Sequence, residues 1–320
     1  MVSRGYALRR VAWGVTTVYL VLSLTFALVA FTPDPNAALV GFAAATQGES
    51  AREAMNAYEA ARNLDAPILR RYVRFLVDLS TFDLGTSLDS GRPVTALVSE
   101  AGLVSLAYVV PAVVVSTAVG SALGVYTTVR NSPVLDRLVA AGSYGALGVP
   151  NFYLAAVVLA AGTAWGVDLR ASPTAPATAT PLATLALAAL VLTTTLLGAQ
   201  LRYVRGETAS RASMAFVRTV RAKGAGRLRV ARHLLRVAAL PLLSLFAAEL
   251  LGVLFVGTFV VEAILDVPGL GTLLLDALDT RDVPVVVGAA LAFVLVAVVV
   301  TVVQDLLRES LDPRTDPGGE

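Results

Sequence analysis

The sequence predicts an all-α polytopic membrane protein with six transmembrane helices. Of its 320 residues, 56% are hydrophobic and only 15% are charged, and the mean hydropathy is +0.73. A soluble domain carries about 25% charged residues. Apolar runs of about 20 residues, the length that crosses the hydrocarbon core of a bilayer, recur along the chain.

Six apolar runs are the predicted spans. They cover approximately residues 11–31, 102–128, 138–165, 182–201, 241–261 and 285–306. The first run is longer than the apolar core of a typical signal peptide, and no A-x-A cleavage site follows it, so we expect it to remain as span one. Pro150 is expected to kink the third span, with neighbouring helices satisfying the freed backbone groups.

Charges between the spans predict the orientation. Residues 202–240 hold ten of the chain's 25 lysines and arginines and a single acid, Glu207. Because basic loops stay in the cytoplasm, this loop and both termini are predicted to be cytoplasmic, in the plasma membrane. The acidic stretches, nine acids and six bases in residues 32–100 and four aspartates in 263–284, are expected outside.

The apolar runs and the charges between them divide the chain into four parts. Residues 1–31 form the cytoplasmic N-terminus and span one, and residues 32–100 form an external cap segment. Residues 101–307 form a five-span domain that contains the cytoplasmic loop 202–240. Residues 308–320 form a cytoplasmic tail.

Missing residue types exclude several kinds of site. There is no cysteine, and the only histidine, His233, rules out a zinc site built on paired histidines. The only lysine, Lys223, is followed by Gly224, so a GxxxxGK[ST] phosphate loop is absent. The spans show no cluster of nucleophiles or acid–base pairs, which argues against an enzyme. The net charge of +2 is too small to indicate nucleic acid.

The basic loop is expected to contain a short helix. Ser210 or Ser213 has the side chain of a helix cap, and Gly224 can adopt the positive φ that ends a helix. Val217 and Val220 lie three residues apart and therefore share one face. A solvated loop attracted to anionic headgroups is the alternative.

The same loop carries a resemblance to a known family. Residues 216–224, FVRTVRAKG, resemble the "YVRTARAKG" signature of permease subunits of dipeptide, oligopeptide and nickel ABC importers, and residues 233–241 resemble the "HALRNALLP" that follows it. These motifs are that family's version of the EAA loop. Further segments resemble family motifs in the same order: 63–67 ("GLDxP"), 82–87 with 91–94 ("GDLGxS…GRPV"), 149–153 ("IPSFW"), 261–271 ("VETVFSWPGLG"), 281–286 ("RDYPVV") and 311–314 ("LDPR").

The resemblance implies the fold of a type I ABC importer permease. It implies an ATP-driven importer of di- or oligopeptides, or of a similar small solute such as nickel, delivered by an external binding protein. The implied partners are a second homologous permease and two ATP-binding subunits, which bind ATP and magnesium, so this chain itself holds no cofactor or metal. The loop helix is then a coupling helix that contacts an ATPase subunit through Arg218, Thr219, Arg221, Ala222, Lys223 and Gly224.

A second set of residues is assigned to the translocation path or its gate: Glu249, Glu262, Pro268, Gly269 and Gly271. Glu249 lies within span five, where a charge facing lipid costs about 2.5–3.5 kcal/mol, so it is expected to face the path or a neighbouring helix. Glu262 lies at the outer boundary and is expected to orient the following turn rather than bind substrate.

The alternative function is a gradient-driven secondary transporter. Such a protein is expected to show several intramembrane acids and interrupted helices in two matching halves. The sequence shows one clear intramembrane acid, Glu249, and no internal repeat.

Overall fold

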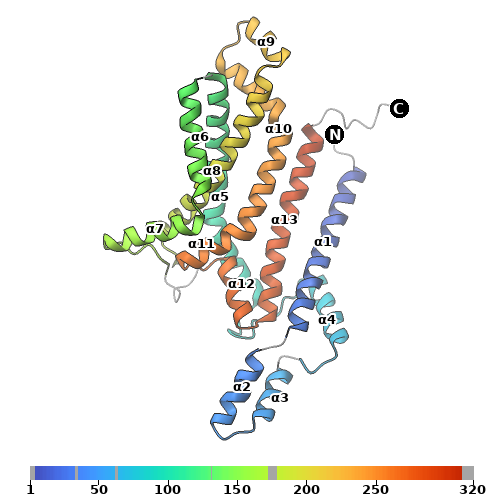
Figure 1. Ribbon diagram of the computed structural model, residues 1–320. Helices are drawn as coiled ribbons and strands as arrows, with labels where there is room; N and C mark the ends of the chain where they lie inside the picture. Colours follow the sequence, from blue (N-terminus) through green and yellow to red (C-terminus); the bar gives the residue numbers. More distant parts are fainter. Residues whose placement is uncertain (1–3, 33–34, 62–63, 131, 172–178, 312–320) are drawn as a thin grey trace.

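The computed structural model describes residues 4–32, 35–61, 64–130, 132–171 and 179–311. Over these ranges the chain is an elongated helical bundle (Figure 1), and the only β-type pairing there is an isolated bridge between Thr86 and Pro93. The described ranges leave out two places that the sequence analysis used. One is residues 312–320 of the predicted tail, and the other is Asn63 of the matched segment 63–67.

Long apolar helices build the bundle: α1 (Arg4–Phe31), α5 (Val94–Arg130), α8 (Leu182–Ala212), α10 (Arg227–Gly252) and α13 (Val283–Leu311). Helix α10 continues through a π-helical turn, η2 (Val253–Gly257), into α11 (Thr258–Leu265). The described residues contain five helices long and apolar enough to cross a membrane, or six if one bent pair counts as a span. The all-α polytopic fold is confirmed.

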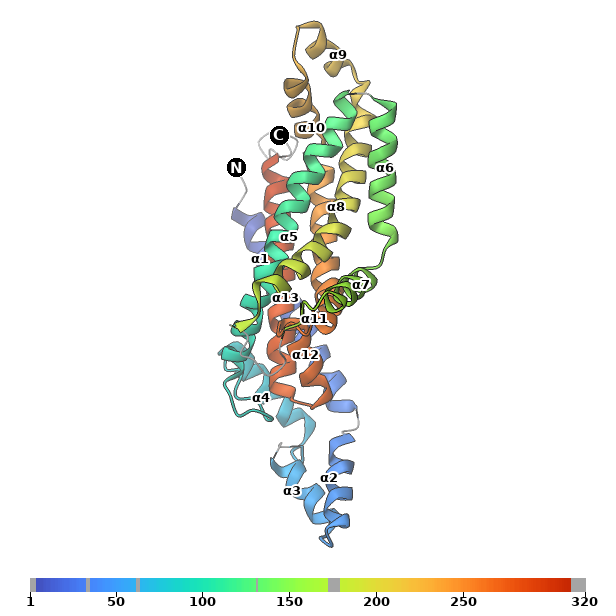
Figure 2. The same cartoon turned by 90° about the vertical axis from the view of Figure 1, so that its left-hand side faces the viewer.

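The predicted third span is not one straight helix. Residues 133–164 form α6 (Pro133–Gly148) and α7 (Asn151–Ala164), whose axes differ by 87°. The residue before a proline is driven out of the helical region, and Val149 is extended, with ψ 114°. Pro150 therefore ends one helix and begins another, and α7 lies across the bundle, packed on α11 (Figure 2).

Several helices also extend beyond the predicted span boundaries. Helix α8 continues 11 residues beyond the predicted end of span four, to Ala212, and α10 begins at Arg227 and includes Pro241. Most of the predicted loop 202–240 is therefore helical, with short breaks on either side of α9 (Ala215–Ala222). Likewise α13 continues to Leu311, so the predicted tail begins as helix.

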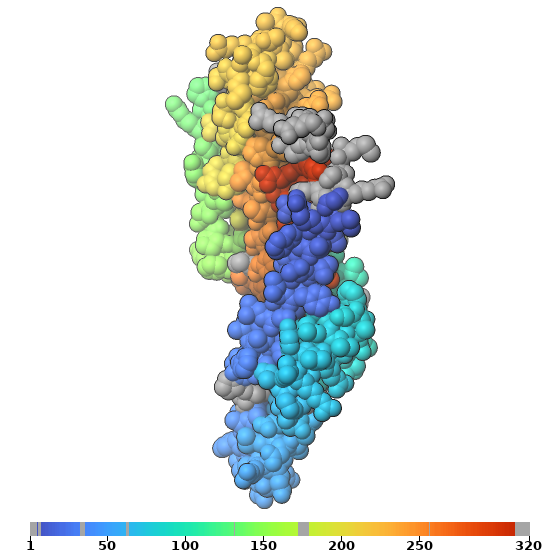
Figure 3. Space-filling model, turned by 90° about the vertical axis from the view of Figure 1, so that its right-hand side faces the viewer, coloured from blue at the N-terminus to red at the C-terminus, as the bar shows by residue number. Residues whose placement is uncertain are grey.

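The predicted cap segment forms two separate parts. Helices α2 (Pro35–Thr46) and α3 (Ala51–Ala61) pack together and project beyond the bundle at the end opposite α9 (Figures 1 and 3). Helix α4 (Ile68–Ser80) instead adjoins α1. Short α12 (Leu270–Asp279) lies at the same end of the bundle as α4.

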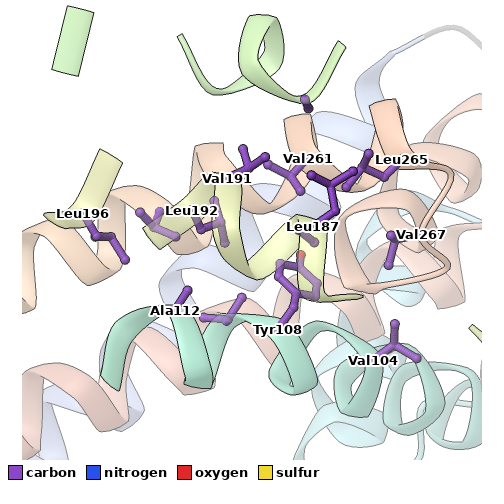
Figure 4. Packing of buried hydrophobic residues seen from close by; sticks show 14 of the residues in the cluster. Val104, Tyr108, Ala112, Leu187, Val191, Leu192, Leu196, Val261, Leu265 and Val267 are labelled. Atoms are coloured by element: carbon purple, nitrogen blue, oxygen red, sulfur yellow. The ribbon is translucent and has the colours of Figure 1, made fainter. Parts of the chain in front are cut away.

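Helices α5 and α8 pack most closely. A Cβ atom added to Gly124 of α5 would lie 2.8 Å from Cβ of Val204 and 3.1 Å from the backbone nitrogen of Arg205, so only glycine allows this approach. Toward the end of the bundle away from α9, side chains of α5, α8 and α11 form the largest apolar cluster (Figure 4). Its labelled members are Val104, Tyr108, Ala112, Leu187, Val191, Leu192, Leu196, Val261, Leu265 and Val267.

Candidate functional site

The short helix α9 lies at the tip of the bundle, between α8 and α10 (Figure 1). Its end follows the prediction, because Gly224 has φ +75°. Its start does not, because Ser210 still belongs to α8 and Ser213 is the residue that ends α8. Met214 occupies the capping position of α9, and no side chain caps the helix.

One buried valine fixes α9 to the rest of the chain. Val217 is 1% exposed and packs against Val230 and Leu234 of α10, with Val129 of α5 beside them. Since α10 begins at Arg227, only a short turn separates the two helices. Helix α9 is therefore in direct contact with the first turns of α10.

The six predicted coupling residues share one property: all of them are exposed. They are Arg218, Thr219, Arg221, Ala222, Lys223 and Gly224. Two apolar side chains flank them, Met214 (45% exposed) and Leu228 (85% exposed). Within the described part of the chain, no ion pair joins the three cations to an acid. The tip thus presents a basic surface with apolar edges, which suits an acidic cleft on a protein partner.

Replacing Val217 with aspartate is expected to detach α9, because it places a carboxylate among apolar side chains. Trypsin should then cleave after Arg218, Arg221 or Lys223 about tenfold faster than in the native protein, since cleavage requires local opening. The measurement is limited proteolysis in detergent, with Thr219→Ala, an exposed change on the same helix, as the control. Equal cleavage rates in the two variants would show that Val217 does not anchor the helix.

The second candidate site centres on Glu262 of α11, which is fully buried. Its Oε1 accepts hydrogen bonds from Ser105 Oγ and Tyr108 Oη of α5, each at 2.6 Å. Its Oε2 accepts the backbone N–H groups of Gly271 (2.7 Å) and Thr272 (3.0 Å). These two N–H groups belong to the first turn of α12, where the helix dipole favours a carboxyl group. One side chain therefore joins α5, α11 and α12.

The glycines of the turn are required by the closeness of Glu262. A Cβ atom on Gly269 would lie 2.0 Å from Glu262 Oε1, and one on Gly271 would lie 2.9 Å from Glu262 Oε2. Asp266 ends α11 in the left-handed conformation, with φ +54°, and Pro268 follows in the turn. Of the five predicted path residues, the structure brings together Glu262, Pro268, Gly269 and Gly271.

Glu249 lies apart from this group. It is half-buried on α10, and the charge of Arg202 on α8 acts on it. A cavity of about 300 Å³ lies between α5, α8, α10 and α13, and a second of about 650 Å³ lies beside α7 and the turn after it. None of the five predicted path residues lines either of these two cavities.

Sequence reasoning missed several partners at these sites. It identified Glu262 but not Ser105 or Tyr108, because nothing local links α5 to α11. It also missed that Ser87 Oγ donates a 2.6 Å hydrogen bond to Oδ2 of Asp282, both residues being buried. Ser87 belongs to the matched segment 82–87 and Asp282 to the matched segment 281–286. Their places in two family motifs were the only sequence signal that could have indicated this contact.

Known proteins resemble the chain over nearly its whole length. Residues 120–317 match the family described as the binding-protein-dependent transport system inner membrane component. The chain is 28% identical to a dipeptide transport system permease of Bacillus subtilis, over 97% of both chains. It is 30% identical to a putative peptide permease of Brucella suis, over 97% of this chain and 98% of the relative. It is 28% identical to a glutathione transport system permease of Salmonella paratyphi A, over 96% and 97%. The chain therefore belongs to the family of inner-membrane permease components of binding-protein-dependent transport systems.

Proposed function

We propose that this chain is the permease subunit of an ATP-driven importer of di- or oligopeptides. The relatives named above transport dipeptides, peptides and glutathione, which is itself a tripeptide, and this favours a peptide over a metal ion as the solute. The proposed complex contains a second homologous permease, two ATP-binding subunits and an external solute-binding protein. The positive-inside bias supports an orientation with α9 and both termini in the cytoplasm.

The exposed, basic α9 carries the ATP-driven part of this proposal. In the proposed mechanism, closure of the ATPase pair displaces α9, and Val217 passes the displacement to α10. Helix α10 leads without a break through η2 to α11 and so to Glu262, which holds the start of α12. A π-helical turn such as η2 is a frequent functional feature and offers a place to bend.

The outer turn and Glu249 receive different roles in this mechanism. Glu262, Pro268, Gly269 and Gly271 form the proposed gate, which moves with α11. Glu249 is the proposed path residue, because it is half-buried on α10 and is not used to hold the turn.

The test is uptake of a labelled dipeptide into proteoliposomes that contain the complex purified from its native membrane. We expect uptake to require ATP on the side of α9 and binding protein on the other side, and to persist when ionophores remove proton and sodium gradients. Uptake that needs no ATP and stops with the ionophores would instead establish the gradient-driven transporter. Identification of the co-purified subunits gives their stoichiometry.

A further inference from the structure

Helix α4 lies beside α1 and not beyond its end. Oη of Tyr72 and Oγ of Ser23 form a 2.9 Å hydrogen bond, and the rings of Phe75 and Phe26 stack with centroids 5.1 Å apart. Ser23 and Phe26 both precede Phe31, the last residue of α1. Helix α4 therefore overlaps the apolar length of α1.

The depth of α4 follows from a contact with α13. Leu79, near the end of α4, packs with Leu22 of α1 and Leu291 of α13. Leu291 lies about 12 Å along the helix axis from Val283, where α13 begins. Since α13 is apolar from its first turn, this contact lies within its membrane-spanning part. Helix α4 is thus at the level of the leaflet farther from α9.

Helix α4 has apolar side chains on two sides, and α1 covers only one of them. Leu69, Val73 and Val77 follow one another at intervals of four residues and are 70%, 53% and 57% exposed. Arg70 and Arg74 lie next to this stripe and are also exposed. Within the described part of the chain, the stripe is left open.

The arginines of α4 are a local exception to the charge of their surroundings. This helix holds three arginines, Arg70, Arg71 and Arg74, and one acid, Asp78, which pairs with only Arg74 of the three, at 3.9 Å. The rest of residues 32–100 holds eight acids and three arginines. Arginine and lysine are normally depleted on the outer side of a membrane protein, which is the proposed side of α4. A cluster of arginines at membrane depth therefore needs an anion close to it. Phosphate groups of phospholipids are the anions present at that depth.

We propose that α4 is a membrane-interfacial helix. Leu69, Val73 and Val77 lie among the acyl chains, and Arg70 and Arg74 bind phosphate groups of anionic phospholipids, as basic amphipathic helices do. In the orientation proposed above, this is the outer leaflet. Such an anchor sets the height at which α2 and α3 project from the membrane.

A lipid partner fits better than a protein partner because the neighbouring surface has the same character. Helix α1 exposes its own stripe of leucines, Leu20, Leu24 and Leu28, each at least 60% exposed. Helices α1 and α4 adjoin on one face of the molecule (Figure 3). The two neighbouring helices therefore each leave a stripe of apolar side chains exposed.

The chain contains no cysteine, so each single-cysteine variant has one labelling site in this subunit, and the unsubstituted complex treated with the same label gives the background from the other subunits. The complex is reconstituted in nanodiscs of phosphatidylethanolamine and phosphatidylglycerol, with labels at Leu69→Cys, Val73→Cys or Val77→Cys. Leu24→Cys on α1 is the lipid reference, and Asn56→Cys, exposed on α3, is the aqueous reference. We expect the α4 labels to collide with oxygen as the Leu24 label does, and severalfold less with a water-soluble nickel chelate than the Asn56 label. Labels that behave like Asn56, or that are shielded from both reagents by a protein surface, would overturn the proposal.

The arginine contacts have their own test. Phosphatidylglycerol bound to the purified complex is titrated and counted by native mass spectrometry. Arg70→Gln and Arg74→Gln are each expected to weaken its binding about fivefold. Arg52→Gln on α3 is the matched control, an exposed arginine outside the proposed interface. Equal binding in all three variants and the native protein would remove the phosphate contact from the proposal.

Discussion

Replacing Glu262 with alanine is expected to destabilise the protein by about 3–5 kcal/mol. The change leaves the hydroxyls of Ser105 and Tyr108 and the N–H groups of Gly271 and Thr272 without their acceptor in a buried site. A buried donor that loses its partner costs about 1–3 kcal/mol, and entry of water offsets part of the sum. The measurement is the thermal unfolding temperature in detergent, together with the amount of complex recovered.

Two substitutions make this result specific. Glu262→Gln keeps the shape and one acceptor oxygen but places an amide NH₂ against donors, so its unfolding temperature should fall between those of the alanine variant and the native protein. Glu53→Gln on α3 makes the same chemical change at an exposed position and should have no effect. If Glu262→Ala unfolds at the native temperature, the hydrogen-bond network does not hold the turn together.

Replacing Gly224 with valine is expected to reduce peptide uptake at least tenfold while ATP hydrolysis continues. Gly224 has φ +75°, and a β-branched residue in that conformation is strained by about 1–3 kcal/mol. The turn between α9 and α10 must then change, which alters the position of α9 relative to Val230 and Leu234. Uptake and ATP hydrolysis are measured on the same proteoliposomes.

A second glycine in the same turn provides a matched control. Gly226 has φ −66° and open space around its Cβ position, so Gly226→Val puts the same side chain in the same turn without strain. Gly224→Asn should retain most of the uptake, because asparagine tolerates positive φ. Native uptake in Gly224→Val would show that this turn does not couple the two activities.

The sequence predicted the all-helical, membrane-spanning type of the fold better than the ends of the spans. Apolar runs report where the membrane lies, but a helix continues into water until a residue stops it. Helix α8 therefore extends to Ala212, well beyond its last apolar run. At Pro150 the sequence cannot distinguish a kink from a corner, because the choice depends on whether α7 finds a packing surface on α11. Helix α2 was not predicted because its sequence lacks the periodic pattern of apolar and polar residues that marks an amphipathic helix.

For the candidate site, local features were predicted and distant pairings were not. Gly224 ends α9 as expected because the effect is confined to one turn. Ser213 was assigned to the wrong helix because a cap for α9 and an end for α8 look alike in sequence. The partners of Glu262 are 154 and 157 residues away in the chain. Their pairing depends on how α5 packs against α11, and no local pattern contains that information.

The unbroken course of α10, η2 and α11 has a geometric consequence. Residues Arg227–Leu265 form a single 39-residue element, about 58 Å long. When this element turns as one body, without bending at η2, about a point near its middle, its two ends move in opposite directions. A rotation of about 10° would shift each end by about 5 Å, on the basis of that length. Inward movement at one face of the membrane would thus accompany outward movement at the other, so the two openings of a central passage would not widen together.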